Sequence, residues 1–185
     1  MARFEATYKV HSKTYVALFH TAWHLLDMAE KHREGSLLNL QAATVFFAFA
    51  FEAYLNHAGD EELTFWEEIN RISSTDKLTV LSKHLGFAVN RSARPFQTIS
   101  GLFQLRNALA HGRTETKTET KTSKTKPNRE AVWCVLPWET LTAESVRRYH
   151  DDVRAAAEQI NAARSMPDDS MWNEGHRKYT IKGPQ

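Results

Sequence analysis

The chain has 185 residues, of which 42% are hydrophobic and 25% are charged. This composition fits one globular domain that can bury a core without cross-links. The single cysteine, Cys134, excludes an internal disulfide framework and an all-cysteine zinc site, and it favours a reducing, cytoplasmic setting. Because the formal net charge is only +2, any affinity for nucleic acid must come from local patches.

Neither a leader nor a membrane segment is expected. The N-terminal stretch has no uninterrupted apolar region of the kind found in signal peptides. The longest apolar run, from Val45 to Phe51, is far shorter than the about 20 residues that span a bilayer as a helix. We therefore expect a cytoplasmic protein that does not use a membrane as a partner.

The first half of the chain predicts helices. Apolar residues recur at helical spacing over about 12–33, which indicates an amphipathic helix. A second helix, over about 37–57, is apolar nearly all round, as expected for the centre of a bundle, and Gly59 is expected to end it. Two shorter helices are expected over about 60–72 and 74–85. The fold class is therefore all-α, an up-and-down bundle of about five helices.

The second half adds two helices and one insertion. A helix over about 95–110 begins with proline in its first turn and ends before Gly112. A Thr/Lys-rich loop follows over 112–130, and the insertion as a whole, around 113–136, is either disordered or a small β-hairpin. The pattern T-A-E-S opens a last helix over about 142–163. We expect a helical domain over 1–164 and an exposed C-terminal tail over 165–185.

The stretch R-N-A-L-A-H-G, from Arg106 to Gly112, carries the most chemistry. Within six residues it supplies a permanent cation, an amide and an imidazole at the predicted end of a helix. On a helical wheel Arg106 falls in the middle of the apolar arc, whereas Asn107 and His111 share a polar edge. A buried guanidinium needs a charged partner, and Glu52 is the charged side chain within the apolar second helix. We therefore predict an Arg106–Glu52 contact.

These residues also allow a purely structural interpretation. Arg106 then belongs to a core ion pair, Asn107 forms hydrogen bonds at the helix end, and His111 is favoured there by the helix dipole. The cations of the insertion are similarly ambiguous, because they either contact RNA phosphates or are simply solvated. Those proposed for RNA contact are Arg113, Lys117, Lys121 and Lys124.

No metal or cofactor site is expected. His20 and His24 lie at i, i+4 spacing in the first helix, but two histidines need further ligands to hold a metal, and the H-E-x-x-H pattern is absent. The sequence also lacks a Walker A loop, a G-x-G-x-x-G fingerprint and a G-x-S-x-G nucleophile motif.

The R-N-x3-H string at a helix end, the preceding long helix with F-E-A-Y-L-N and the all-α layout resemble the HEPN superfamily. This superfamily includes prokaryotic toxins, abortive-infection proteins and RNA-cleaving domains of antiviral systems. The resemblance covers about residues 12–163 and rests mainly on the residues from Arg106 to His111. It implies a metal-independent endoribonuclease that acts on RNA as a homodimer, with Arg106, Asn107 and His111 as catalytic residues.

The resemblance also implies their roles and the partners. His111 would be the general acid or base, Arg106 would stabilise charge on the phosphate, and Asn107 would orient either group. An antitoxin or a defence-system protein is an implied partner. Some members carry a tyrosine two residues after the motif histidine, which a nucleotidyltransferase antitoxin modifies, but Arg113 stands there in this chain. Two other functions stay open: a non-catalytic HEPN-like module that binds RNA, a nucleotide or a protein, and a purely structural helical dimer.

Overall fold

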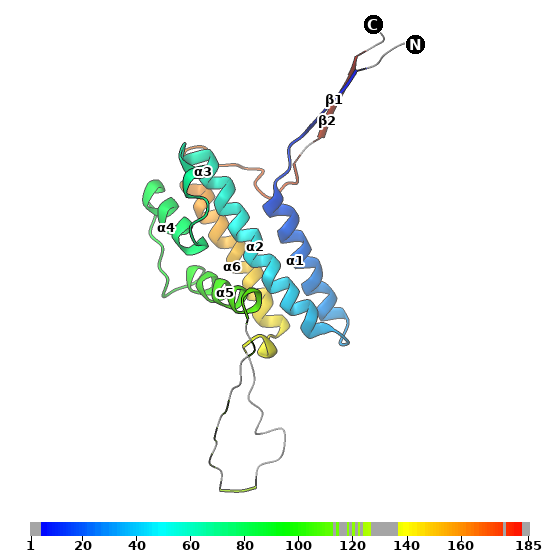
Figure 1. Cartoon of the computed structure of the whole chain (residues 1–185), viewed down its shortest axis with the longest axis vertical. Coiled ribbons are helices and arrows are strands. Elements are labelled where there is room, and N and C mark those ends of the chain that lie inside the picture. Colours follow the sequence, from blue (N-terminus) through cyan, green and yellow to red (C-terminus); the bar gives the residue numbers. More distant parts are fainter. Residues whose placement is uncertain are drawn as a thin grey trace.

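The computed structural model describes residues 5–112, 137–175 and 177–182, together with positions 114, 118, 120, 122 and 124–126 of the insertion (Figure 1). The described part is an all-α bundle with one two-stranded ribbon, which confirms the predicted fold class. In chain order its elements are β1 (Glu5–Val10), α1 (Thr14–Lys31), α2 (Ser36–Glu62), α3 (Trp66–Ile69), α4 (Ser74–Leu85), α5 (Phe96–Ala110), the 3₁₀ helix η2 (Pro137–Thr140), α6 (Ala143–Ala163) and β2 (Arg177–Lys182).

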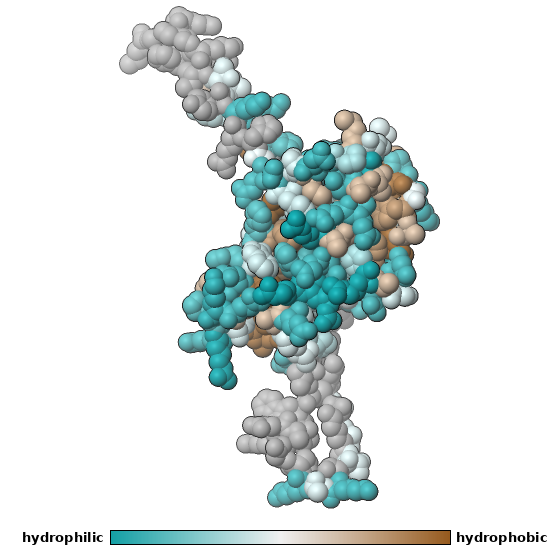
Figure 2. Space-filling model, turned by 180° about the vertical axis from the view of Figure 1, so that it is seen from behind, coloured by the Kyte–Doolittle hydropathy of each residue, from teal (hydrophilic) through white to brown (hydrophobic). Residues whose placement is uncertain are grey.

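Helix α2 is the central helix of the bundle. It packs against α1, α4, α5 and α6 (Figure 1), and its side chains Phe47, Phe51, Tyr54 and Leu55 are almost completely buried. By length and composition alone α2 is apolar enough to cross a membrane. Its packing against those four helices accounts for much of that composition, although Leu38 and Phe49 are exposed. Seen from behind, hydrophilic side chains cover most of the bundle (Figure 2).

The end of α2 differs from the prediction. The helix does not stop at Gly59 but continues to Glu62, and of the predicted helix over 60–72 only the single turn α3 is present. The glycine is required for packing, because a Cβ at position 59 would overlap the indole ring of Trp66. Trp66 is 3% exposed and lies against the helix at this point. Gly59 thus admits a tryptophan rather than ending a helix.

Helix α4 occupies the predicted range, Ser74–Leu85. Ser73 is the N-cap, and its Oγ accepts a hydrogen bond from the backbone N–H of Asp76 at 3.2 Å. The helix ends at Gly86, whose φ of 71° is the left-handed conformation that glycine adopts most easily. Because Ser73 provides the cap, Ser74 becomes the first helical residue, and it is buried.

The C-terminal region is not an exposed tail throughout, contrary to the prediction. Met171 is 5% exposed, and its carbonyl oxygen accepts a hydrogen bond of 2.6 Å from the hydroxyl of Tyr15. The ring of Trp172 lies against Phe19, with 4.7 Å between the ring centroids. Beyond this segment β2 pairs antiparallel with β1, so that both ends of the chain form one ribbon that leaves the bundle (Figure 1). Contacts of Met171 and Trp172 with α1 therefore hold part of the segment that was predicted to be an exposed tail.

Candidate functional site

Arg106 lies on the face of α5 that is turned toward α2 and α4. Its Nη2 lies 2.7 Å from Oε2 of Glu52, so the predicted contact is present, and the same nitrogen donates to Oγ of Ser74 at 3.1 Å. The guanidinium carbon lies 5.8 Å from the ring centroids of both Phe49 and Phe103. With 16% of its side chain exposed, Arg106 is held between two aromatic rings and a carboxylate.

Lys77 is a member of this cluster that the sequence analysis missed. Its Nζ lies 3.1 Å from Oε1 of Glu52, and only 4% of its side chain is exposed. The two cations share one carboxylate, which leaves this ion-paired cluster with a formal charge of +1. The sequence already indicated that Lys77 is buried, because it shares the inner face of α4 with Ser74, Leu78 and Leu81. Arg106 interrupts the apolar face of α5 in the same way.

A small pocket opens beside Arg106. Its volume is about 160 Å³, and its walls come from α2, α5 and the start of α4: Glu52, Ser73, Ser74, Thr75, Phe103, Arg106 and Asn107. Nε of Arg106 is buried and has no hydrogen-bond partner within the described part of the chain. The unpartnered Nε of Arg106 and the N-terminal end of α4 favour an anion in this pocket, whereas Glu52 in its wall and Asp76 in the first turn of α4 oppose one.

Asn107 and His111 occupy different surroundings. Asn107 is exposed and lines the pocket beside Arg106. His111 is the C-cap of α5, with its backbone N–H 2.9 Å from the carbonyl oxygen of Asn107. Its ring is exposed, makes no hydrogen bond with any described residue and does not line the pocket. One chain therefore brings Arg106 and Asn107 together but leaves the imidazole outside, as the angle of about 140° between positions 106 and 111 requires.

Of the basic residues suggested for RNA contact, Lys124 belongs to the described part of the chain. Arg113, Lys117 and Lys121 lie outside the described residues, as does Cys134 and the expected pairing of residues 131–136. Lys124 is exposed.

The histidines of α1 lie apart from each other's polar contacts. Nδ1 of His20 lies 3.3 Å from Oε1 of Glu174, and His24 is exposed. Among the described residues no three ligating side chains of His, Cys, Asp or Glu gather in one place.

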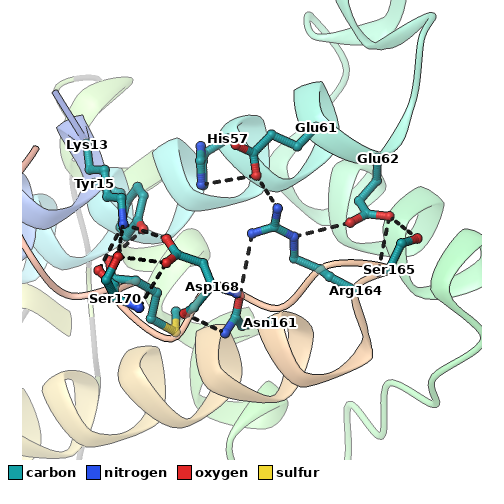
Figure 3. A network of polar contacts seen from close by, with 11 residues as sticks. Lys13, Tyr15, His57, Glu61, Glu62, Asn161, Arg164, Ser165, Asp168 and Ser170 are labelled. Carbon is teal, nitrogen blue, oxygen red and sulfur yellow. Dashed lines mark hydrogen bonds and ion pairs between the residues drawn. The ribbon is translucent and has the colours of Figure 1, made fainter. Parts of the chain in front are cut away.

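A second polar network lies at the other end of the bundle, where the C-terminal segment crosses the end of α2 (Figure 3). Arg164, with 3% of its side chain exposed, binds Glu61 and, at 3.3 Å, Glu62. Nearby, Nζ of Lys13 lies 2.5 Å from Oδ2 of Asp168.

The surroundings of two titratable groups in this network shift their pKa values. Burial opposes ionisation of Asp168, but hydrogen bonds from Lys13 and Ser170 outweigh it and bring the pKa of this carboxyl to about 2. Burial lowers the pKa of His57. Arg164 is paired with two carboxylates and Lys13 with one, so these five groups carry a formal charge of −1. The network therefore fastens the C-terminal segment and offers no surplus positive charge to a phosphate.

No family model, curated protein or solved structure matches the chain. The assignment of a function therefore depends on the motif and on the geometry around Arg106.

Proposed function

We propose that the protein is a metal-independent endoribonuclease of the HEPN type. Arg106, Asn107 and His111 are its catalytic residues, and Glu52 supports Arg106. One observation carries the proposal: Arg106, whose buried Nε has no hydrogen-bond partner among the described residues, and Asn107 line a small pocket at the end of α5, shortly before an exposed histidine. A phosphodiester has the charge and the size to enter such a pocket.

The proposed reaction is cleavage by the neighbouring ribose hydroxyl. A His111 imidazole takes the proton of the 2′-OH, the 2′ oxygen forms a bond to phosphorus, and the bond from phosphorus to the 5′ oxygen breaks. The leaving oxygen takes up a proton, from an imidazolium or from water. The products carry a 2′,3′-cyclic phosphate and a 5′-OH. Arg106 stabilises the charge that grows on the non-bridging oxygens, and Asn107 orients the phosphate.

The ion pair with Glu52 fits a supporting role. A carboxylate that bound Arg106 alone would neutralise it, but Oε1 of Glu52 is bound to Lys77. Glu52 thus fixes the direction of the guanidinium, and its charge is shared between Arg106 and Lys77.

We infer that the active form is a homodimer. His111 lies outside the Arg106 pocket of its own chain, and a two-fold axis beside α5 would bring His111 of one copy to the pocket of the other. The surface of α5 suits a close approach, because Gly101 and Ala108 are exposed beside a hollow of about 430 Å³ that Leu105 and Tyr149 also line.

The deciding experiment measures cleavage of RNA by the purified protein in the presence of a chelator. We expect cleavage with cyclic-phosphate ends, lost in both His111→Ala and Arg106→Ala but kept in His84→Ala, which removes another exposed histidine from the last turn of a helix. Mixing the two inactive variants should restore activity, because one site of the mixed dimer then holds both wild-type groups. Cleavage that survives in both variants would contradict the proposal.

A second candidate is a non-catalytic module that binds RNA, a nucleotide or a protein partner such as an antitoxin. The observation in its favour is that Nη2 of Arg106 is already bound by Glu52 and by Ser74. RNA binding that weakens in Arg106→Ala, without cleavage by the wild type, would identify this function. In either case we propose a cytoplasmic protein of toxin–antitoxin or phage-defence type.

A further inference from the structure

The ribbon of β1 and β2 stands apart from the bundle and has open edges. Its register pairs Thr7 with Thr180, Tyr8 with Tyr179 and Lys9 with Lys178. No third strand pairs with it among the described residues. An isolated two-stranded ribbon is marginally stable in water, and the unpaired N–H and C=O groups of an open edge are a template for another strand. A further strand at an open edge would therefore stabilise the ribbon and satisfy its unpaired backbone groups.

The two faces of β1 differ in chemistry. Ala6, Tyr8 and Val10 alternate with Thr7 and Lys9, so the even positions give one apolar face and the odd positions a polar one. Tyr8 is 73% exposed and Val10 is 62% exposed. These two side chains lie on the same face of the strand, so this apolar face is open to solvent in the single chain.

The sequences of the strands decide which edge a second copy can use. Antiparallel pairing of two copies about a two-fold axis through Thr7 places position 5 of one β1 opposite position 9 of the other. Glutamate then stands opposite lysine twice, and the even positions stay on one face. Strand β2 reads R-K-Y-T-I-K and has no acidic residue, so its self-pairing would place cations against cations.

We propose that β1 pairs antiparallel with β1 of a second copy of this chain, centred on Thr7. The product is a continuous four-stranded sheet in the order β2–β1–β1–β2, with its apolar positions on a single face. In Figure 1 the ribbon leaves the bundle at the end opposite to η2, the yellow turn before α6. This interface is separate from the α5 surface and does not depend on the proposed nuclease activity.

A cysteine scan tests the pairing directly. In a Cys134→Ser background, Thr7→Cys creates one thiol per chain at the two-fold axis. Directly opposed residues of an antiparallel pair have Cα atoms about 4.5–5.5 Å apart, within the range that a disulfide spans. We expect rapid, nearly complete formation of a cross-linked dimer under mild oxidation. Thr180→Cys is the matched control, because it lies on the other strand opposite Thr7 and should cross-link at least tenfold more slowly.

Charge reversal provides an independent measurement by analytical ultracentrifugation. Lys9→Glu should raise the dissociation constant of this interface about tenfold, whereas Lys178→Glu, with the same charge change on β2, should leave it within a factor of two. Glu5→Lys combined with Lys9→Glu should restore association. An Ala108→Arg change on α5 should not alter cross-linking through Thr7→Cys. Equal cross-linking at positions 7 and 180, or equal effects of the two reversals, would overturn the proposal in favour of a different partner for the ribbon.

Discussion

Arg106 and Glu52 meet across the bundle with 2.7 Å between Nη2 and Oε2, although 54 positions separate them in the chain. The other carboxylate oxygen of Glu52 accepts from Lys77. One acidic side chain of the central helix therefore holds a cation from α5 and another from α4. This sharing links the stability of the bundle to the direction of the proposed catalytic arginine.

Removal of Glu52 should destabilise the fold. Glu52→Ala leaves the side chains of Arg106 and Lys77, 16% and 4% exposed, without their carboxylate. We expect the free energy of unfolding to fall by about 3 kcal/mol, measured by urea denaturation. Glu68→Ala, which removes an exposed carboxylate from α3, should change it by less than about 0.5 kcal/mol. Equal effects of the two substitutions would mean that the ion pairs do not matter for stability.

An exchange of charges at positions 52 and 106 should restore only part of the stability that is lost when the Arg106–Glu52 pair is broken. Glu52→Arg combined with Arg106→Glu re-forms one pair, but the new arginine at position 52 then faces the buried ammonium of Lys77. Adding Lys77→Met removes this repulsion, so the triple variant should unfold at a higher urea concentration than the double variant. The reverse order would show that Lys77 is not bound to Glu52 in solution.

His111→Ala should separate activity from stability. The ring is exposed and makes no hydrogen bond with a described residue, so the free energy of unfolding should stay within about 0.5 kcal/mol of the wild type. Loss of a general acid or base should nevertheless lower RNA cleavage by at least about 100-fold. Thermal unfolding and single-turnover cleavage on the same preparations provide the comparison. A large loss of stability would instead favour the structural interpretation of His111.

Features that follow from the residue pattern of a single helix could be predicted from the sequence. The Arg106–Glu52 pair was predictable because each charge interrupts an apolar helix face and a buried charge needs a partner. Gly59 was assigned wrongly because glycine ends helices and also admits large neighbours, and only the position of Trp66 distinguishes the two. The packing of Met171 and the pairing of β2 with β1 join residues that are far apart in the chain, so no local pattern could indicate them.

The role assigned to Gly59 can be tested by adding one methyl group. Gly59→Ala pushes a Cβ into the indole ring of Trp66, and we expect a loss of about 1–3 kcal/mol of stability from overpacking. Gly101→Ala is the matched control in another helix, because its Cβ would meet no atom within 4 Å. At position 101 the better helix propensity of alanine should raise the free energy of unfolding by at most about 1 kcal/mol. Both values come from urea unfolding, and a neutral Gly59→Ala would show that Trp66 lies elsewhere.

The pairing of Lys13 with Asp168 should make stability depend on pH in acid. Burial opposes ionisation of Asp168, but the hydrogen bonds from Lys13 and Ser170 hold its pKa at about 2 in the folded protein, below the 3.8 of a free carboxyl. The unfolded chain therefore binds more protons than the folded one between these values, so stability rises with pH. The contribution is complete above about pH 4 and is lost as the pH falls toward 2.

We expect this pair to contribute about 1 kcal/mol at neutral pH, after allowance for the 25% exposure of the Asp168 side chain. Asp168→Asn should remove this part of the slope between pH 4 and pH 2 in urea unfolding curves. Lys13→Met should reduce the same part, because the carboxylate then loses its strongest hydrogen-bond donor. The double variant should show no further reduction, since both changes break one interaction. Additive losses would mean that Lys13 and Asp168 stabilise the C-terminal segment independently of each other.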